Sequence, residues 1–220
     1  MRVYHFVPRS YGLENLKFRR LKIATIQDLN DPFELLCIDL SNPDLRHGMR
    51  EWKAEVARRF GMLCFSLSWR NPVQWSHYAD KHRGLCLAFD VPDNLVQPVT
   101  YSGLRSTREA SDLLEQGIRS LSEATVIKFL STKFAHWHYE KEVRAFPELK
   151  ERDPVTRLYF ADFSDELKLV EVIVGSESDL TRQEVNEALG GLAHTTSIRK
   201  VRLAFKSFRV TNQLDQQLWG

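Results

Sequence analysis

Two glutamates and an arginine alternate near the middle of the chain, where Glu140, Glu142 and Arg144 occupy every second position. If residues 139–146 form a β-strand, the three side chains project from one face, because successive side chains of a strand point to opposite faces. Two carboxylates at that spacing repel each other unless solvent, a cation or a ligand compensates them. The pattern allows two interpretations. Arg144 neutralises the pair on a solvated surface, or the carboxylates face a cleft as an acid–base pair with Arg144 as a binding residue.

A second polar pattern lies on the predicted strand 62–68, where Ser66 and Ser68 interrupt an otherwise apolar run. Strand geometry places both hydroxyls on one face. They either bind a polar ligand or satisfy neighbouring polar groups inside the core, because buried hydroxyls require hydrogen-bond partners. Both interpretations stay open.

Aromatic and imidazole side chains supply a third set of candidates. Trp75 and Tyr78 lie in a predicted helical turn over residues 75–79, and His5 is the imidazole of the predicted strand 3–7. A histidine on a half-buried strand is either a satisfied structural group or a ligand-binding group. We expect His5, Ser66, Tyr78 and Glu142 to converge on one pocket, because each polar group beside an apolar strand needs a partner.

Several common enzyme classes lack their sequence signatures. The chain contains no GxxxxGK[ST], GxGxxG or GxSxG motif, which argues against P-loop, dinucleotide-binding Rossmann and α/β-hydrolase sites. The histidine pairs 77/82 and 136/138 are not accompanied by cysteines at CxxC spacing, as a zinc site would require. We therefore expect no metal.

The composition is that of a folded globular chain. Of 220 residues, 43% are hydrophobic and 27% are charged, which excludes disordered and collagen-like proteins. No apolar run approaches the roughly 20 residues of a membrane-spanning helix, and a net charge of +2 does not indicate a polyanion partner. Cys37, Cys64 and Cys86 each lie in an apolar run, which is typical of small buried side chains in a reducing compartment. We expect a cytoplasmic protein.

The periodicity predicts short strands mixed with a few helices, and a single α+β domain over residues 1–220 built on a mixed, mainly antiparallel sheet. A capping box of Thr181 and Glu184 predicts the start of a late helix. The other predicted helices cover 13–17, 49–60 and 107–131, and the predicted strands cover 3–7, 21–25, 62–68, 84–90, 139–146, 169–174 and 198–210.

The block Asn30–Glu34 has turn chemistry, because Pro32 fixes φ and the Asx side chains bond nearby backbone. We expect it to be structural, with Phe33 buried as its anchor. Removal of a buried phenyl ring costs about 3–5 kcal/mol.

Basic residues are interleaved with aromatic residues at two places, near Lys17–Lys22 and near the end of the chain around Phe205 and Phe208. This combination either grips phosphates and stacks bases or protects a solvated edge strand from aggregation. The cations of the later segment are Arg199, Lys200, Arg202, Lys206 and Arg209.

Several blocks of residues 3–146 together resemble the bacterial domain-of-unknown-function family 2971, whose biochemistry is unassigned. The two most specific blocks are Asn30–Glu34 and the pattern WxxYAxxHxG that begins at Trp75. The others are Tyr4-His5-Phe6, Cys64-Phe65-Ser66, Phe89-Asp90, and Trp137 with Glu140, Glu142 and Arg144.

The order of these blocks also resembles, more distantly, the core of the ADP-ribosyltransferases. The resemblance implies an ADP-ribosyltransferase-like fold that uses NAD as substrate, a protein or nucleic-acid acceptor, and a toxin or phage-defence context. It implies that His5 holds the NAD ribose or phosphate, that Ser66, Ser68 or Tyr78 flanks the nicotinamide, and that Glu142 bonds the nicotinamide ribose, with Glu140 as the preceding glutamate.

This chemistry is physically consistent, because cleavage of the glycosidic bond of NAD develops an oxocarbenium-like ribose that a fixed carboxylate stabilises. We expect Glu142 to be that carboxylate, Glu140 to accept the proton of the nucleophile, and Tyr78 and Trp75 to stack on the nicotinamide. The alternative is a non-catalytic nucleic-acid-binding or regulatory module.

Overall fold

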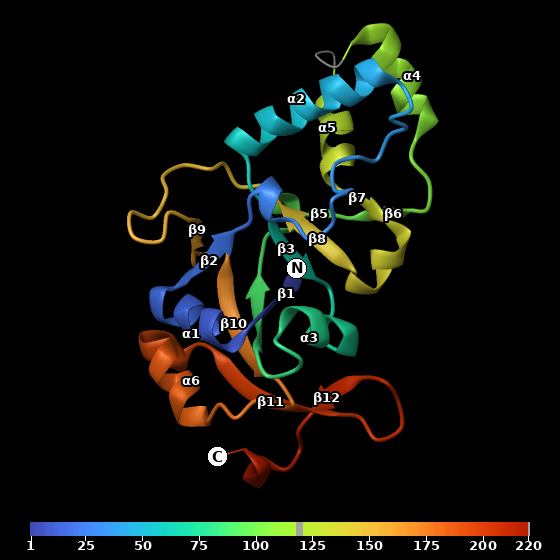
Figure 1. Ribbon diagram of the computed structural model, residues 1–220. Helices are drawn as coiled ribbons and strands as arrows, with labels where there is room; N and C mark the ends of the chain where they lie inside the picture. The colour runs from blue at the N-terminus through green and yellow to red at the C-terminus, as the bar shows by residue number, and fades with distance from the viewer. Residues whose placement is uncertain (118–120, 220) are drawn as a thin grey trace.

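The computed structural model describes residues 1–117 and 121–219, and within them the chain forms a mixed, mainly antiparallel sheet with helices on both sides (Figure 1). The large sheet has eight strands in the order β12-β11-β10-β4-β1-β3-β8-β5. Their bounds are β1 Arg2–Val7, β3 Leu63–Ser66, β4 Leu85–Asp90, β5 Gln97–Pro98, β8 Glu142–Ala145, β10 Lys168–Val174, β11 Ser197–Leu203 and β12 Val210–Asn212.

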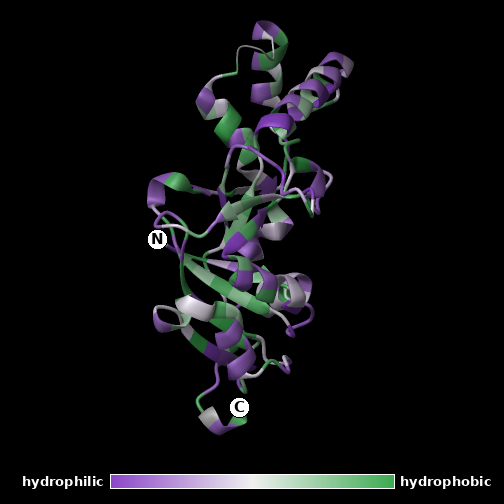
Figure 2. Ribbon diagram, turned by 90° about the vertical axis from the view of Figure 1, so that its left-hand side faces the viewer, coloured by the Kyte–Doolittle hydropathy of each residue, from purple (hydrophilic) through white to green (hydrophobic). Residues whose placement is uncertain are grey.

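The centre of the sheet forms where the sequence is most continuously apolar. β4 carries a run of five buried residues before Asp90, and it pairs antiparallel with β1 on one side and β10 on the other. Figure 2 shows these central strands as a mostly hydrophobic band. In the described residues β10 and β11 are the parallel pair of this sheet, and a short helix joins them.

Strands β1 and β3 meet at a single registered pair, Tyr4↔Ser66, whereas β1 and β4 pair over six residues. The sheet therefore opens between β1 and β3. An opening in a sheet exposes backbone and side-chain groups that a continuous ladder would cover. This is the place where a site can form.

Helices cover both faces of the sheet. α1 (Arg9–Phe18) and α6 (Arg182–Leu189) pack together on the face that holds Val3, Leu87 and Val172. On the other face, Trp75 of α3 (Pro72–Tyr78) packs with Phe6 of β1. The capping box of Thr181 and Glu184 begins α6 as predicted.

A helical part lies beyond one end of the sheet, at the top of Figure 1. It has its own small apolar core, which includes Met49 and Phe129. Its helices are α2 (Pro43–Arg59), α4 (Thr107–Gln116) and α5 (Glu123–Leu130). The remaining strands form two small sheets, β2 (Arg20–Ile23) with β9 (Tyr159–Asp162) and β6 (Thr100–Ser102) with β7 (Thr132–Phe134).

Three predicted elements differ in the structure. The single helix predicted over 107–131 is divided into α4 and α5, with Ser122 as the N-cap of α5, and residues 118–120 of that prediction lie outside the described residues. The strand predicted over 198–210 is the antiparallel pair β11 and β12, because the segment turns back at 204–209. The strand predicted over 139–146 begins only at Glu142. The residues before it form the 3₁₀ helix η4 (Ala135–Glu140), which ends at a left-handed Lys141.

The described residues contain no helix whose length and hydropathy would let it cross a membrane.

Candidate functional site

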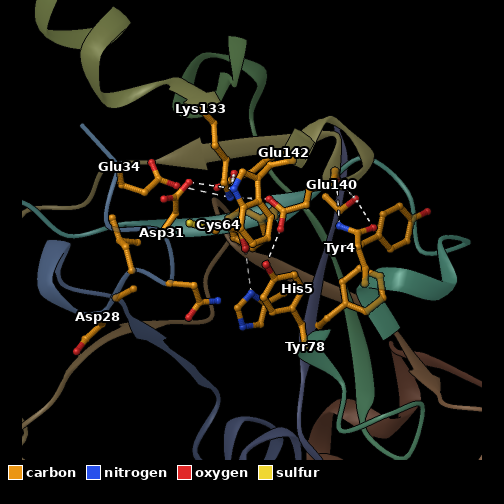
Figure 3. A pocket seen from close by; sticks show the side chains of 18 residues that line it. Tyr4, His5, Asp28, Asp31, Glu34, Cys64, Tyr78, Lys133, Glu140 and Glu142 are labelled. Atoms are coloured by element: carbon orange, nitrogen blue, oxygen red, sulfur yellow. Dashed lines mark hydrogen bonds and ion pairs between the residues drawn. The ribbon is translucent and has the colours of Figure 1, made fainter. Parts of the chain in front are cut away.

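A cavity of about 200 Å³ opens where β1 and β3 separate. His5 and Tyr4 of β1, Ser66 of β3, Tyr78 of α3 and Glu142 of β8 all line it (Figure 3). The four residues expected to converge, His5, Ser66, Tyr78 and Glu142, therefore do line one pocket. What each of them does there stays a prediction.

His5 bridges the opening between the two strands. Its Nδ1 lies 3.1 Å from the carbonyl oxygen of Cys64 on β3. Because a carbonyl only accepts, Nδ1 is the protonated nitrogen, and in the described residues Nε2 has no hydrogen-bond partner. Burial lowers the pKa of His5 and outweighs the opposing effect of the Cys64 hydrogen bond. The ring is thus neutral at pH 7 and presents an acceptor nitrogen.

Ser66 fixes the chain that carries Glu140. Its Oγ donates to the Glu140 carbonyl oxygen at 2.6 Å, and Gln74 Nε2 donates to the same oxygen at 3.0 Å. Ser68 lies beyond the end of β3, accepts from Arg70 N, and does not line the cavity. The prediction that both serine hydroxyls face one site is therefore wrong for Ser68, because the strand ends at Ser66.

Glu140 reaches the cavity from η4 rather than from a strand. Tyr78 donates its hydroxyl to Glu140 Oε1 at 2.5 Å. Burial raises the pKa of Tyr78, and the hydrogen bond to Glu140 raises it further. The phenol stays protonated and serves as a donor. Tyr101 also stays protonated, because burial raises its pKa to about 12, and its hydroxyl oxygen accepts a hydrogen bond from Glu142 N at 2.8 Å.

Glu142 and Glu34 both accept hydrogen bonds from the buried guanidinium of Arg144. Arg144 Nε and Nη2 donate to the two oxygens of Glu142 at 2.8 and 3.1 Å, and its Nη1 and Nη2 donate to Glu34 at 3.0 and 2.7 Å. Arg144 is 0% exposed. It does not line the cavity, so the prediction of a ligand-binding Arg144 is wrong. It holds Glu142 from behind, because its five N–H groups form a rigid fork that matches carboxylates.

Lys133 of β7 joins the carboxylates from the other side. Its Nζ lies 2.6 Å from Glu140 Oε2, 3.0 Å from Glu142 Oε2 and 3.5 Å from Glu34 Oε1 (Figure 3). We call these five residues, Glu34, Lys133, Glu140, Glu142 and Arg144, the buried charge cluster; each side chain in it is at most 10% exposed. Three carboxylates and two cations give the cluster a formal charge of −1.

The cluster keeps Glu142 ionised. Burial raises the pKa of Glu142, but the charges and hydrogen bonds of Arg144 and Lys133 together outweigh burial and hold the pKa below its ordinary 4.5. Burial lowers the pKa of Lys133, and the carboxylates of Glu142 and Glu140 reverse this to a net increase. Burial also raises the pKa of Cys64 well above its ordinary value, so this thiol on the cavity wall is a poor nucleophile.

The Asn30–Glu34 block forms part of the cavity wall. Asp31 accepts from Trp137 Nε1 at 2.9 Å and from Phe33 N at 2.9 Å, and both Asp31 and Glu34 are buried. Phe33, however, is 62% exposed, and it lines a second cavity of about 270 Å³ that shares Lys133 with the first. The prediction that Phe33 anchors the block by burial is wrong, because the buried anchors are the two acids.

Trp75 also differs from its expected role. It is 0% exposed in the core on the α3 side of the sheet, donates Nε1 to Trp69 O at 2.6 Å and stacks on His82. It does not line the cavity, so it cannot stack on a ligand there. The aromatic walls of the cavity are instead Tyr4, Phe6, Phe65, Tyr78 and Trp137.

Sequence reasoning missed Lys133 and the site roles of Asp31 and Glu34. A lone lysine in the segment 132–134 carries no local signal of burial. The Asn30–Glu34 block was interpreted as a turn and as part of the family resemblance, and neither interpretation gave its two acids a role in the site. The available signal was the pair Glu140 and Glu142 beside apolar segments, because two carboxylates that are buried together need cations as partners.

The described residues contain no group of three or more His, Cys, Asp or Glu side chains placed to hold a metal ion. The cavity has an ionised carboxylate, an excess of negative charge, aromatic walls and a neutral imidazole. Such a site is complementary to a flat ligand that carries or develops positive charge.

Residues 74–145 match a family model. The family is described as Protein of unknown function (DUF2971). The matched segment carries Tyr78, Lys133, Glu140 and Glu142, and it overlaps the later part of the motif resemblance given above, which it supports. The description of that family assigns no reaction. No curated protein and no solved structure matches the chain at a significant level.

Proposed function

We propose that the protein is an NAD-dependent ADP-ribosyltransferase that transfers ADP-ribose to a macromolecular acceptor, a protein or a nucleic acid. The observation that supports it most is the convergence of His5, Tyr78, Glu140 and Glu142 on one aromatic-walled cavity with an excess of carboxylates. These residues come from β1, α3, η4 and β8, so the convergence is a property of the fold and not of one segment.

The charge of the cavity suits the nicotinamide end of NAD. The nicotinamide ring of NAD is a cation and is planar, so aromatic faces and carboxylates both attract it. Tyr78 and Trp137 line the cavity with their rings, while the three carboxylates of the buried charge cluster exceed its cations by one. The neutral His5 offers Nε2 as an acceptor, which fits a ribose hydroxyl better than a phosphate.

The reaction needs a carboxylate that stays ionised beside the ribose. In the step we propose, the bond between ribose C1 and the nicotinamide nitrogen breaks, and its electron pair leaves on neutral nicotinamide. The nucleophile of the acceptor forms the new bond to C1. Glu142 stabilises the positive charge that develops on the ribose, and its lowered pKa keeps it ionised at pH 7.

In this step Glu140 is the group that accepts the proton of the nucleophile. One of its oxygens accepts from Tyr78 and the other contacts Lys133. Lys133 contacts both carboxylates and offsets the repulsion between them. Lys133 is a positioning residue in this scheme.

The test is a thermal melt with and without NAD, followed by nicotinamide release in the presence of protein, RNA and DNA acceptors. If NAD binds only the folded state, ligand at 100 times its Kd raises stability by ~2.7 kcal/mol, which is roughly 5–11 °C for a chain of this size. Glu142→Gln should keep the melting shift and lower the release rate about 100-fold or more, because Gln keeps the shape but removes the charge. Glu148→Gln, an exposed glutamate outside the cavity, is the matched control.

Two further variants guard the test against a Glu142→Gln protein that fails to fold. Tyr78→Phe removes the donor of the 2.5 Å hydrogen bond, Glu140→Gln keeps an acceptor oxygen but removes its charge, and both leave Arg144 paired. Both should slow release with the NAD shift retained. If NAD gives no shift and no nicotinamide is released, the proposal is wrong. A shift without release from wild type, with all acceptors supplied, favours a non-catalytic nucleotide-binding module.

A further inference from the structure

The turn between β11 and β12, residues 204–209, carries two phenyl rings in open solvent. Phe205 is 90% exposed and Phe208 is 98% exposed. The turn lies at the opposite end of the molecule from α2 and α4 (Figure 1). Single exposed apolar residues need no explanation, but two rings on one short turn form a patch that favours being covered.

The charge around these rings has one sign. Arg202, Lys206 and Arg209 accompany the two phenylalanines, and the sequence contains no acidic residue between Glu187 and Asp215. The Arg202 guanidinium lies 4.4 Å from the centroid of the Phe205 ring. In the described part of the chain, none of the three cations forms an ion pair. We call Arg202, Phe205, Lys206, Phe208 and Arg209 the hairpin surface.

Arg199 is excluded from this surface because it already has partners. It donates to Glu171 and Asn212, each at 2.9 Å. β12 is an edge strand of the large sheet, and cations on an edge strand protect it from aggregation. That explanation accounts for lysine and arginine but not for two exposed phenyl rings, which would promote association instead.

We propose that the hairpin surface binds single-stranded nucleic acid, with bases stacked on Phe205 and Phe208 and phosphates held by Arg202, Lys206 and Arg209. Single strands offer unstacked bases to aromatic side chains, and every base has a π-face. In a duplex the bases are stacked on one another, so no base face is available to an aromatic side chain at the surface. The surface reads features that RNA and DNA share, so both should bind. This inference does not depend on the proposed activity.

The test is fluorescence anisotropy with labelled oligothymidylate and oligouridylate of about 12 nucleotides, since stacking sites cover ~4–16 nucleotides. Phe205→Ala and Phe208→Ala should each weaken binding about 5- to 150-fold, the range of one lost base–aromatic stack. Lys206→Gln with Arg209→Gln should reduce the slope of log affinity against log salt by about 1.4, because each phosphate contact contributes about 0.7. Tyr11→Ala and Arg58→Gln, which change an exposed aromatic and an exposed cation elsewhere, should change neither.

Three results would overturn the inference. The first is equal affinity for a duplex of the same length. The second is binding that Tyr11→Ala weakens as much as Phe208→Ala does. The third is the absence of oligonucleotide binding. If vesicles that contain phosphatidylserine then bind the wild-type protein but not the Phe208→Ala variant, the surface belongs to an anionic membrane instead. Because every substituted side chain is exposed, the circular dichroism spectrum and melting temperature of each variant should stay those of wild type.

Discussion

The buried charge cluster and the hairpin surface use similar side chains in opposite ways. In the buried charge cluster, Arg144 is 0% exposed and every carboxylate contacts at least one cation within 3.0 Å. On the hairpin surface the cations have no ion-pair partner in the described residues, and the rings are almost fully exposed. One region pairs its cations inside the protein, and the other leaves its cations free for a partner outside it.

The difference is one of desolvation. A charge removed from water must recover its hydration energy from fixed partners, so a buried pair loses much when either partner is removed. An exposed charge is already solvated, and its removal changes little in the fold. Substitutions in the buried charge cluster should therefore change stability together with any activity. Substitutions on the hairpin surface should change binding alone.

The largest effect should come from Arg144→Met, which removes the guanidinium that donates to both Glu34 and Glu142 and leaves these buried carboxylates only their contacts with Lys133 among the cations of the cluster. We expect the free energy of unfolding to fall by about 3–5 kcal/mol, or roughly 6–20 °C in melting temperature. Urea denaturation measures the change. Arg209→Met on the hairpin surface is the matched control and should stay within ~0.5 kcal/mol of wild type. Equal effects of the two substitutions would contradict the comparison.

A smaller effect should appear in the pH dependence of the free energy of unfolding. Glu142 has a folded-state pKa below its ordinary 4.5, so the unfolded chain binds its proton first as the pH falls. The stability that Glu142 contributes is therefore complete above pH ~4.5 and is lost as the pH falls through the folded-state pKa. Carboxyl ¹³C NMR should give a titration midpoint below 4.5 for Glu142. Glu142→Gln should show a shallower loss of stability with acid than wild type, and a midpoint above 4.5 would refute the arrangement.

The smallest effects should come from exposed rings. Phe33→Ala and Phe208→Ala should each change the free energy of unfolding by less than ~0.5 kcal/mol, because these rings are 62% and 98% exposed. Phe129→Ala, at a fully buried ring of α5, should cost about 3–5 kcal/mol in the same urea experiment. A large loss from Phe33→Ala would show that the segment packs more tightly than its exposure indicates.

Local signals predicted those elements whose causes are local. The apolar run before Asp90 predicted β4, and Thr181 with Glu184 predicted the start of α6, since both depend on neighbours in sequence. Local signals failed where the chain changes direction. Residues 139–146 alternate as a strand would, yet η4 occupies the first part, because Glu140 is tied through its carbonyl to Ser66 and Gln74. Those partners lie far away in sequence and no local pattern contains them.

The sequence by itself determined which residues had to find partners: His5, Ser66, Tyr78, Glu140 and Glu142 are polar groups beside apolar segments, and their convergence could be predicted. Only the tertiary structure decided which side chains are the partners of these polar groups. Lys133 and Glu34 come from separate parts of the chain, and Arg144 faces them rather than the cavity. The physical reason is that the type of a side chain and the apolar residues beside it in sequence already show that a buried polar or charged group needs a partner. Compensation itself depends on distances of about 3 Å between groups that only the folded sheet brings together.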